Sequence, residues 1–155
     1  AIRAFVEPMR AVIRSRPLIG VSDLMNAVLD RMPYKKGVTS ADTSAAQSFA
    51  AGVGVCQDHT HVFIAACRTL GVPARYVSGY AYSPDREVVA SHAWAEAWLA
   101  TRWVSFDISN ARSVGGGHIK LAIGLDYLDA CPVRGVRLGG GGEELATAAK
   151  VSPLS

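Results

Sequence analysis

Apolar residues in the first third of the chain recur at the spacing of an α-helix. The best-defined face has four members, three or four positions apart: Leu24, Ala27, Val28 and Met32. Ser22 is the predicted N-cap of this helix, and Pro33 follows its last turn. Thr43 or Ser44 is expected to cap a further short helix. We therefore predict that residues 1–51 are mostly helical.

A second helical pattern follows two glycines, Gly52 and Gly54, and ends where Gly71 and Pro73 interrupt the chain. Its apolar positions are Val62, Phe63, Ala66 and Leu70. This pattern places Cys56 at or near the N-terminus of a helix.

The period then changes from that of a helix to two, the period of a half-buried strand. The alternating segments are residues 75–80, 90–99, 103–108 and 119–123, and residues 144–151 are expected to add a last edge strand. Helices followed by strands predict an α+β fold in which the helices pack on an antiparallel sheet.

The length of 155 residues, half of them hydrophobic, is sufficient for one compact domain, and we expect residues 1–155 to form a single one. The apolar runs are all shorter than the roughly 20 residues that cross a bilayer, so no membrane span is expected. Because the sequence begins at Ala1, inside a helical pattern, we expect it to be part of a longer protein.

The 16 lysines and arginines are spread along the chain and give a net charge of +3, which argues against a nucleic-acid partner. Three cysteines in no disulfide spacing favour a reducing compartment, and we predict the cytoplasm. The glycine runs 115–117 and 139–142 lack the ending of a phosphate loop, so no nucleotide cofactor is expected.

Cys56 has the setting of a reactive thiol. The glycines before it allow close approach of a ligand to the backbone, and a helix start offers free N–H groups and a positive potential that stabilise a thiolate. Cys67, inside the helix, and Cys131, before Pro132, are interpreted as structural.

A catalytic thiolate needs a base and a group that orients the base, and one predicted hairpin supplies both. The alternation in residues 91–99 puts His92 on the same face as Trp94, Glu96 and Trp98. With a loop over residues 99–102, Trp98 faces Trp103, Trp94 faces Asp107 and His92 faces Ser109. Asp107 is then diagonal to His92, within reach of its side chain.

Two other interpretations of these residues remain open at this point. His92 and Asp107 can be a buried histidine and a strand-end aspartate of an ordinary sheet. Alternatively, Cys56, His59 and His61 can bind zinc with Cys67 or His92, although His59 and His61 project about 200° apart on a helix. We therefore assign no metal and no other cofactor.

Several longer blocks resemble bacterial transglutaminase-like proteins, a group of cysteine proteases within the transglutaminase superfamily. The blocks are GVCQDHTHVFIAACRTLGVPARYVSGY, SHAWAEAWL, WVSFDISN and HIKLAIGLDYLDACPVRGV, and they cover about residues 20–140 in the family's order. The resemblance implies a papain-like fold with a Cys-His-Asp triad at Cys56, His92 and Asp107. It also implies a β-rich region upstream in many members.

The sequence departs from the family pattern at three places. The hairpin LATRW is short, His59 stands where an aromatic residue is usual, and Ile108 and Ser109 replace the usual proline and threonine. These differences concern the rim of the substrate site more than the triad.

Together these observations predict a cysteine-dependent enzyme that hydrolyses amide or peptide bonds of a peptide or protein substrate. The Cys56 backbone N–H is the expected oxyanion donor, with Gln57 or Gln47 as a second donor and Trp94 and His59 as further substrate-contacting candidates. The alternatives are a transglutaminase that cross-links glutamine to lysine, and a non-catalytic binding module that retains the fold.

Overall fold

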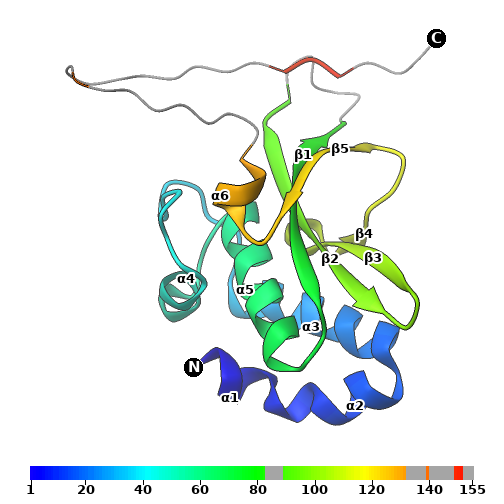
Figure 1. Cartoon of the computed structure of the whole chain (residues 1–155). Helices are drawn as coiled ribbons and strands as arrows, with labels where there is room; N and C mark the ends of the chain where they lie inside the picture. The colour runs from blue at the N-terminus through cyan, green and yellow to red at the C-terminus, as the bar shows by residue number, and fades with distance from the viewer. Residues whose placement is uncertain (83–88, 132–138, 140–148, 152–155) are drawn as a thin grey trace.

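The computed structural model describes residues 1–82, 89–131, 139 and 149–151, and these form a helical layer packed on one sheet (Figure 1). The elements before the sheet are α1 (Ile2–Val6), η1 (Glu7–Met9), α2 (Arg10–Ser15), α3 (Pro17–Arg31), α4 (Ala45–Ala51) and α5 (Cys56–Thr69). The remaining elements are β1 (Ala74–Ala81), β2 (Ser91–Leu99), β3 (Arg102–Asp107), η2 (Ile108–Asn110), β4 (Arg112–Ser113), β5 (His118–Gly124) and α6 (Tyr127–Ala130).

The sheet is antiparallel and has the strand order β4-β3-β2-β1-β5. The predicted α+β class is therefore confirmed, and the four predicted strands within the described residues are present. Of the predicted strand 144–151, residues 144–148 lie outside the described part, while Ala149 makes a single antiparallel bridge with Val89.

Helix α5 packs on β2 because the two elements have complementary surfaces. Its apolar stripe is buried, with Val62, Phe63, Ala66 and Cys67 fully inaccessible. The facing positions of β2 are small, Ala93, Ala95 and Ala97, and these side chains belong to the same core. Small residues allow the helix axis to approach the sheet closely. Because side chains alternate along a strand, the residues between these alanines face away from α5.

Helix α3 begins earlier than predicted. Pro17, not Ser22, stands at its first turn, where a proline loses no hydrogen bond and its fixed φ suits a helix. The Ser22 hydroxyl instead donates to the Leu18 carbonyl at 2.8 Å, a bond made inside the helix. The prediction for Ser44 is confirmed, because it caps α4 in a reciprocal pair with Gln47.

The β2–β3 hairpin has the predicted register, with Trp98 paired with Trp103 and Leu99 with Arg102. The turn contains only residues 100 and 101, shorter than the predicted four-residue loop. Strand β3 ends at Asp107 and the chain turns into η2, so the predicted pairing of His92 with Ser109 is wrong. Ser109 turns away, and its hydroxyl lies 3.0 Å from the Nδ1 atom of His59.

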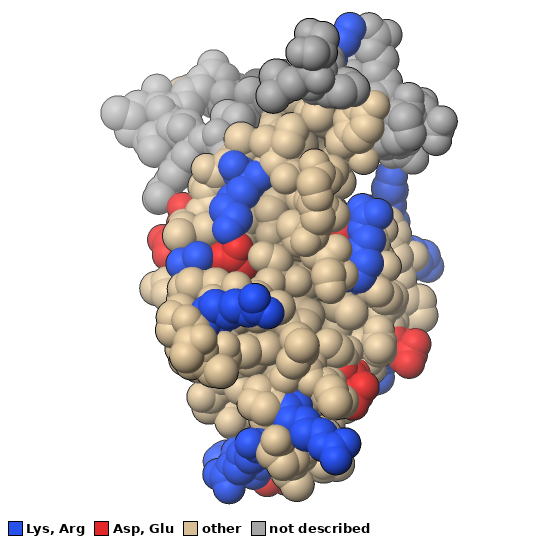
Figure 2. Space-filling model, turned by 90° about the vertical axis from the view of Figure 1, so that its right-hand side faces the viewer, with Lys and Arg blue, Asp and Glu red and all other residues tan. Residues whose placement is uncertain are grey.

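None of the helices in the described part of the chain is both long enough and apolar enough to cross a bilayer. Figure 2 shows the side of the molecule that lies to the right in Figure 1. On this side, the lysine and arginine side chains of the described residues are scattered, and carboxylates lie beside several of them. This face therefore lacks the continuous basic patch typical of nucleic-acid binding.

Candidate active site

Cys56 is the first residue of α5, as the sequence predicts. The start of this helix is held by Asp58, whose Oδ2 atom accepts hydrogen bonds from the Val55 N–H at 2.8 Å and the Thr39 hydroxyl at 2.7 Å. Gly54 permits this arrangement, because a Cβ at that position would lie 2.6 Å from the Asp58 Cβ. The thiol is thus placed at the positive end of a 14-residue helix by contacts on its buried side.

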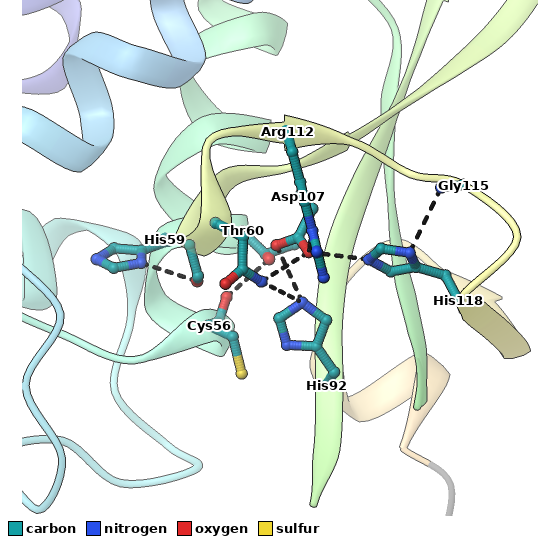
Figure 3. Close-up of polar contacts among 10 residues, drawn as sticks. Cys56, His59, Thr60, His92, Asp107, Arg112, Gly115 and His118 are labelled. Atoms are coloured by element: carbon teal, nitrogen blue, oxygen red, sulfur yellow. Dashed lines mark hydrogen bonds and ion pairs between the residues drawn. The ribbon is translucent and has the colours of Figure 1, made fainter. Parts of the chain in front are cut away.

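His92 and Asp107 come together from neighbouring strands (Figure 3). The His92 Nε2 atom lies 3.0 Å from Asp107 Oδ1, and Asp107 is completely buried. Oδ1 has no aligned hydrogen-bond donor among the described residues, so the contact with His92 is best described as an ion pair. The second ring nitrogen of His92 faces the side on which Cys56 lies.

The electrostatics of this pair favour a charged imidazolium. Burial by itself lowers the pKa of His92, but the contacts with Asp107 and the Cys56 thiol outweigh it and raise the pKa to about 9. Burial likewise raises the pKa of Asp107, and its contacts with His92 and His118 reverse the direction and hold the pKa below its ordinary value. A protonated His92 stabilises a thiolate beside it, as cysteine nucleophiles require.

Asp107 has three further neighbours that the sequence interpretation missed. Its Oδ2 atom accepts a hydrogen bond from the Asn110 amide at 2.8 Å and lies 2.9 Å from His118 Nε2 and 3.4 Å from Arg112 Nε. Asn110 and Arg112 follow Asp107 closely in the chain, so a search for polar residues next to the predicted aspartate would have found them. His118 belongs to the other edge of the sheet, and no local pattern pairs it with Asp107.

Cys56 and His92 open into a pocket of about 430 Å³. Its described lining also includes two tyrosines and three longer polar or basic side chains: Tyr34, Tyr82, Lys36, Asn110 and Arg112. Asp107 is not among the lining residues, which agrees with its complete burial. A ligand in this pocket therefore meets the thiol and the imidazole, whereas the buried carboxylate acts only through its contact with His92.

The two glutamines proposed as oxyanion donors have other partners. The Gln47 side-chain oxygen accepts from the Ser44 N–H at 2.9 Å in the cap of α4. The Gln57 amide donates to the Ala41 carbonyl at 2.9 Å. Because both side chains are anchored by loop and helix-cap contacts, neither is held toward the thiol as the prediction requires.

The structure also argues against Trp94 and His59 as substrate contacts. Both are fully buried, and neither lines the pocket that contains Cys56. Trp94 packs beside the rings of His92 and His118, with ring centroids 6.1 Å and 5.4 Å away. His59 lies with Nε2 2.6 Å from the Met32 carbonyl oxygen, so it links α5 to the end of α3. Both residues support the site from inside the core.

The zinc alternative built on Cys56, His59 and His61 is not supported by the geometry. His59 uses both ring nitrogens in the contacts given above, and His61 Nε2 accepts from the Tyr127 N–H at 3.1 Å. Within the described residues, one other group offers three ligand atoms within 4.8 Å of one another: His92, Asp107 and His118. Asp107 Oδ2 already lies 2.9 Å from His118 Nε2 and accepts a hydrogen bond from the Asn110 amide, so we interpret this group as a hydrogen-bonded cluster.

Comparison with known proteins identifies the family to which this fold belongs. The family model of the transglutaminase-like superfamily matches residues 10–108, so the chain belongs to that superfamily. An uncharacterized protein of Mycobacterium leprae (strain TN) is 32% identical over an alignment of 132 residues that covers 81% of this chain and 47% of the relative. The chain thus spans about half the length of the curated relatives it matches.

Two solved structures share both sequence and fold with the chain. A protein from Cytophaga hutchinsonii, described as a proposed cysteine protease, is 35% identical and superimposes with a TM-score of 0.65, over 72% of this chain and 38% of its own. The periplasmic domain of TgpA from Pseudomonas aeruginosa, bound to ethylmercury, is 27% identical with a TM-score of 0.53, over 71% of this chain and 44% of its own.

Proposed function

We propose that this domain is a cysteine-dependent acyl-transfer enzyme that hydrolyses amide or peptide bonds with the triad Cys56, His92 and Asp107. The observation that carries the proposal is the arrangement around His92: one ring nitrogen lies 3.0 Å from the buried Asp107 carboxylate, and the other faces a thiol at a helix start. Membership of a superfamily with a related proposed cysteine protease supports it.

In the proposed reaction, the Cys56 thiolate attacks the carbonyl carbon of a bound amide. The resulting oxyanion is stabilised by the Cys56 backbone N–H and the positive end of α5. His92 then donates its proton to the leaving amine, and a thioester remains on Cys56. A water molecule, deprotonated by His92, attacks the thioester and releases the carboxylic acid and the free thiolate. Asp107 stabilises the imidazolium throughout.

The acceptor in the second step decides whether the enzyme hydrolyses or cross-links its substrate. Water gives a protease or amidase, whereas a lysine amine gives a transglutaminase. Hydrolysis is favoured because water is always present and the described pocket lining contains no acidic side chain that would bind a lysine. A non-catalytic binding module is the second alternative, and the contact of His92 with the buried Asp107 carboxylate argues against it. We also keep the cytoplasm as a prediction, which cell fractionation would test against the periplasmic location of the TgpA domain.

One experiment separates these functions. The protein and its Cys56→Ala variant are each incubated with a peptide library that contains glutamine and lysine, and the products are identified by mass spectrometry. Hydrolysis predicts new carboxyl termini or deamidated side chains in the parent alone, and transamidation predicts glutamine–lysine cross-links. Identical product profiles for the parent and Cys56→Ala, with no alkylation of Cys56 by iodoacetamide near neutral pH, would contradict the proposal.

A further inference from the structure

Asp107 is shared between two histidines that come from different strands. Its Oδ1 atom lies 3.0 Å from His92 Nε2 of β2, and its Oδ2 atom lies 2.9 Å from His118 Nε2 of β5. The His118 side chain is only 4% exposed, and His118 is not among the residues that line the pocket with Cys56. A triad mechanism uses the first histidine and leaves the second without a role.

The surroundings of His118 determine which of its nitrogens carries the proton. The Gly115 N–H points to Nδ1 at 3.4 Å, a long contact in which Nδ1 can only accept. The proton of the neutral ring is therefore assigned to Nε2, which donates to Asp107. His118 thus acts as a donor to the carboxylate without needing a charge of its own.

A buried carboxylate on a short side chain needs such donors to fix its plane, because the torsion that rotates it has a broad energy well. Asn110 reaches Oδ2 from η2, and His118 reaches the same atom from β5. The charged Arg112, from β4, also lies near this atom, but its side chain is 53% exposed and its charge is screened by solvent. Donors on Oδ2 from two elements direct Oδ1 toward His92.

The position of His118 is itself fixed by packing. The ring makes a T-shaped contact with buried Trp94, with the ring centroids 5.4 Å apart and an interplanar angle of 79°. Strand β5 is held against β1 by antiparallel pairing, in which Ala81 pairs with His118 and Gly79 with Lys120. A rigid donor on a strand provides a more constant orientation than a solvent-exposed side chain.

We propose that His118 is a positioning residue, which holds the Asp107 carboxylate in the orientation that supports the charged form of His92. It acts through Asp107 and does not touch the substrate. The proposal rests on the proposed function, because a positioning role requires that Asp107 serve the triad.

The test compares two substitutions that differ in one property. His118→Gln keeps an N–H donor near the position of Nε2, whereas His118→Phe keeps the ring volume and removes the donor. Lys120→Gln, on the same strand and paired with Glu96 rather than with Asp107, is the matched control. Measured quantities are the pH dependence of Cys56 alkylation by iodoacetamide, kcat/KM on a cleaved peptide, and Tm.

We expect His118→Phe to move the alkylation midpoint upward by about half a pH unit or more and to lower kcat/KM roughly 3- to 30-fold, a smaller loss than removal of a triad member gives. The alkylation midpoint and kcat/KM of His118→Gln should be close to those of the parent and the control. The inference is overturned if the two His118 variants have the parent's pH profile, or if both lose activity equally in proportion to Tm. A parent whose Cys56 reacts no faster than a free thiol at neutral pH contradicts the proposed function itself.

Discussion

At the scale of the residue, the main distinction is between two cysteines of the same helix. Cys56 lies at the helix start in a pocket, whereas Cys67 is fully buried and burial raises the pKa of its thiol to about 12. Only the thiolate is a nucleophile, so the two residues should differ strongly in reactivity.

Substitution of each cysteine tests this difference. Cys56→Ala should abolish turnover and iodoacetamide labelling without unfolding the protein, because the first turn of a helix tolerates alanine. Cys67→Ala should label like the parent and lose about 1 kcal/mol or more of stability through the small void it leaves. Peptide mapping after labelling checks both. Label on Cys67, or turnover retained in Cys56→Ala, would refute the assignment of the nucleophile.

At the scale of the element, the proposed triad and its neighbour His118 depend on different kinds of information. The start of α5 and the β2–β3 register could be predicted because both follow from local patterns: glycines before a helical period, and a hairpin between alternating strands. These two features already place Cys56, His92 and Asp107. The donor His118 could not be predicted, because its contact with Asp107 depends on β5 pairing with β1 across the sheet.

Other misplaced residues have similar causes. Trp94 lies on the face of β2 opposite to the alanines that pack on α5. The sequence pattern does not show that His118 and Gly79 pack against Trp94 on that face. His59 lies about one helical turn beyond Cys56 in the sequence, but its partners, Met32 and Ser109, come from distant segments. The local sequence pattern therefore does not reveal burial that arises from contacts between distant segments.

The approach of β5 to the site depends on Gly79 of β1. A Cβ there would lie 1.9 Å from the Ile119 carbonyl oxygen and 2.7 Å from the Trp94 ring, so Gly79→Ala should displace β5 and with it His118. We expect a loss of about 1–3 kcal/mol in the free energy of unfolding and a higher midpoint for Cys56 alkylation. Gly116→Ala is the control, because a Cβ there meets nothing within 4 Å. Equal stability and reactivity of the two variants would contradict this role for Gly79.

At the scale of the whole molecule, the raised pKa of His92 links stability to pH. A group whose pKa is higher in the folded state stabilises the fold below its unfolded pKa of 6.5 and loses this contribution as the pH rises through about 9. In the Cys56→Ala background the thiol does not titrate and its share in raising the His92 pKa is lost, so the free energy of unfolding should fall over a narrower part of this window, through the contact of His92 with Asp107. Urea unfolding followed by circular dichroism measures it. Adding His92→Gln should remove most of the slope, and an unchanged slope would show that His92 is not the group responsible.

Metal dependence is a second property of the molecule as a whole. The histidines and Asp107 are engaged with protein groups, so activity and Tm should be the same before and after treatment with a chelator. Elemental analysis of the purified protein accompanies the measurement. Stoichiometric zinc together with chelator-induced loss of activity or stability would instead assign His92, Asp107 and His118 to a metal site.

The most direct test of the triad is the pH dependence of Cys56 alkylation in Asp107→Asn. An asparagine keeps the shape of the side chain but removes the charge that stabilises the His92 imidazolium. Asp126→Asn is the control, because Asp126 caps α6 and asparagine caps equally well. The triad predicts an upward shift of the alkylation midpoint and a fall in kcat/KM of roughly 10- to 10⁴-fold for Asp107→Asn alone. A profile that superimposes on those of the parent and Asp126→Asn in both rate and midpoint would contradict the triad.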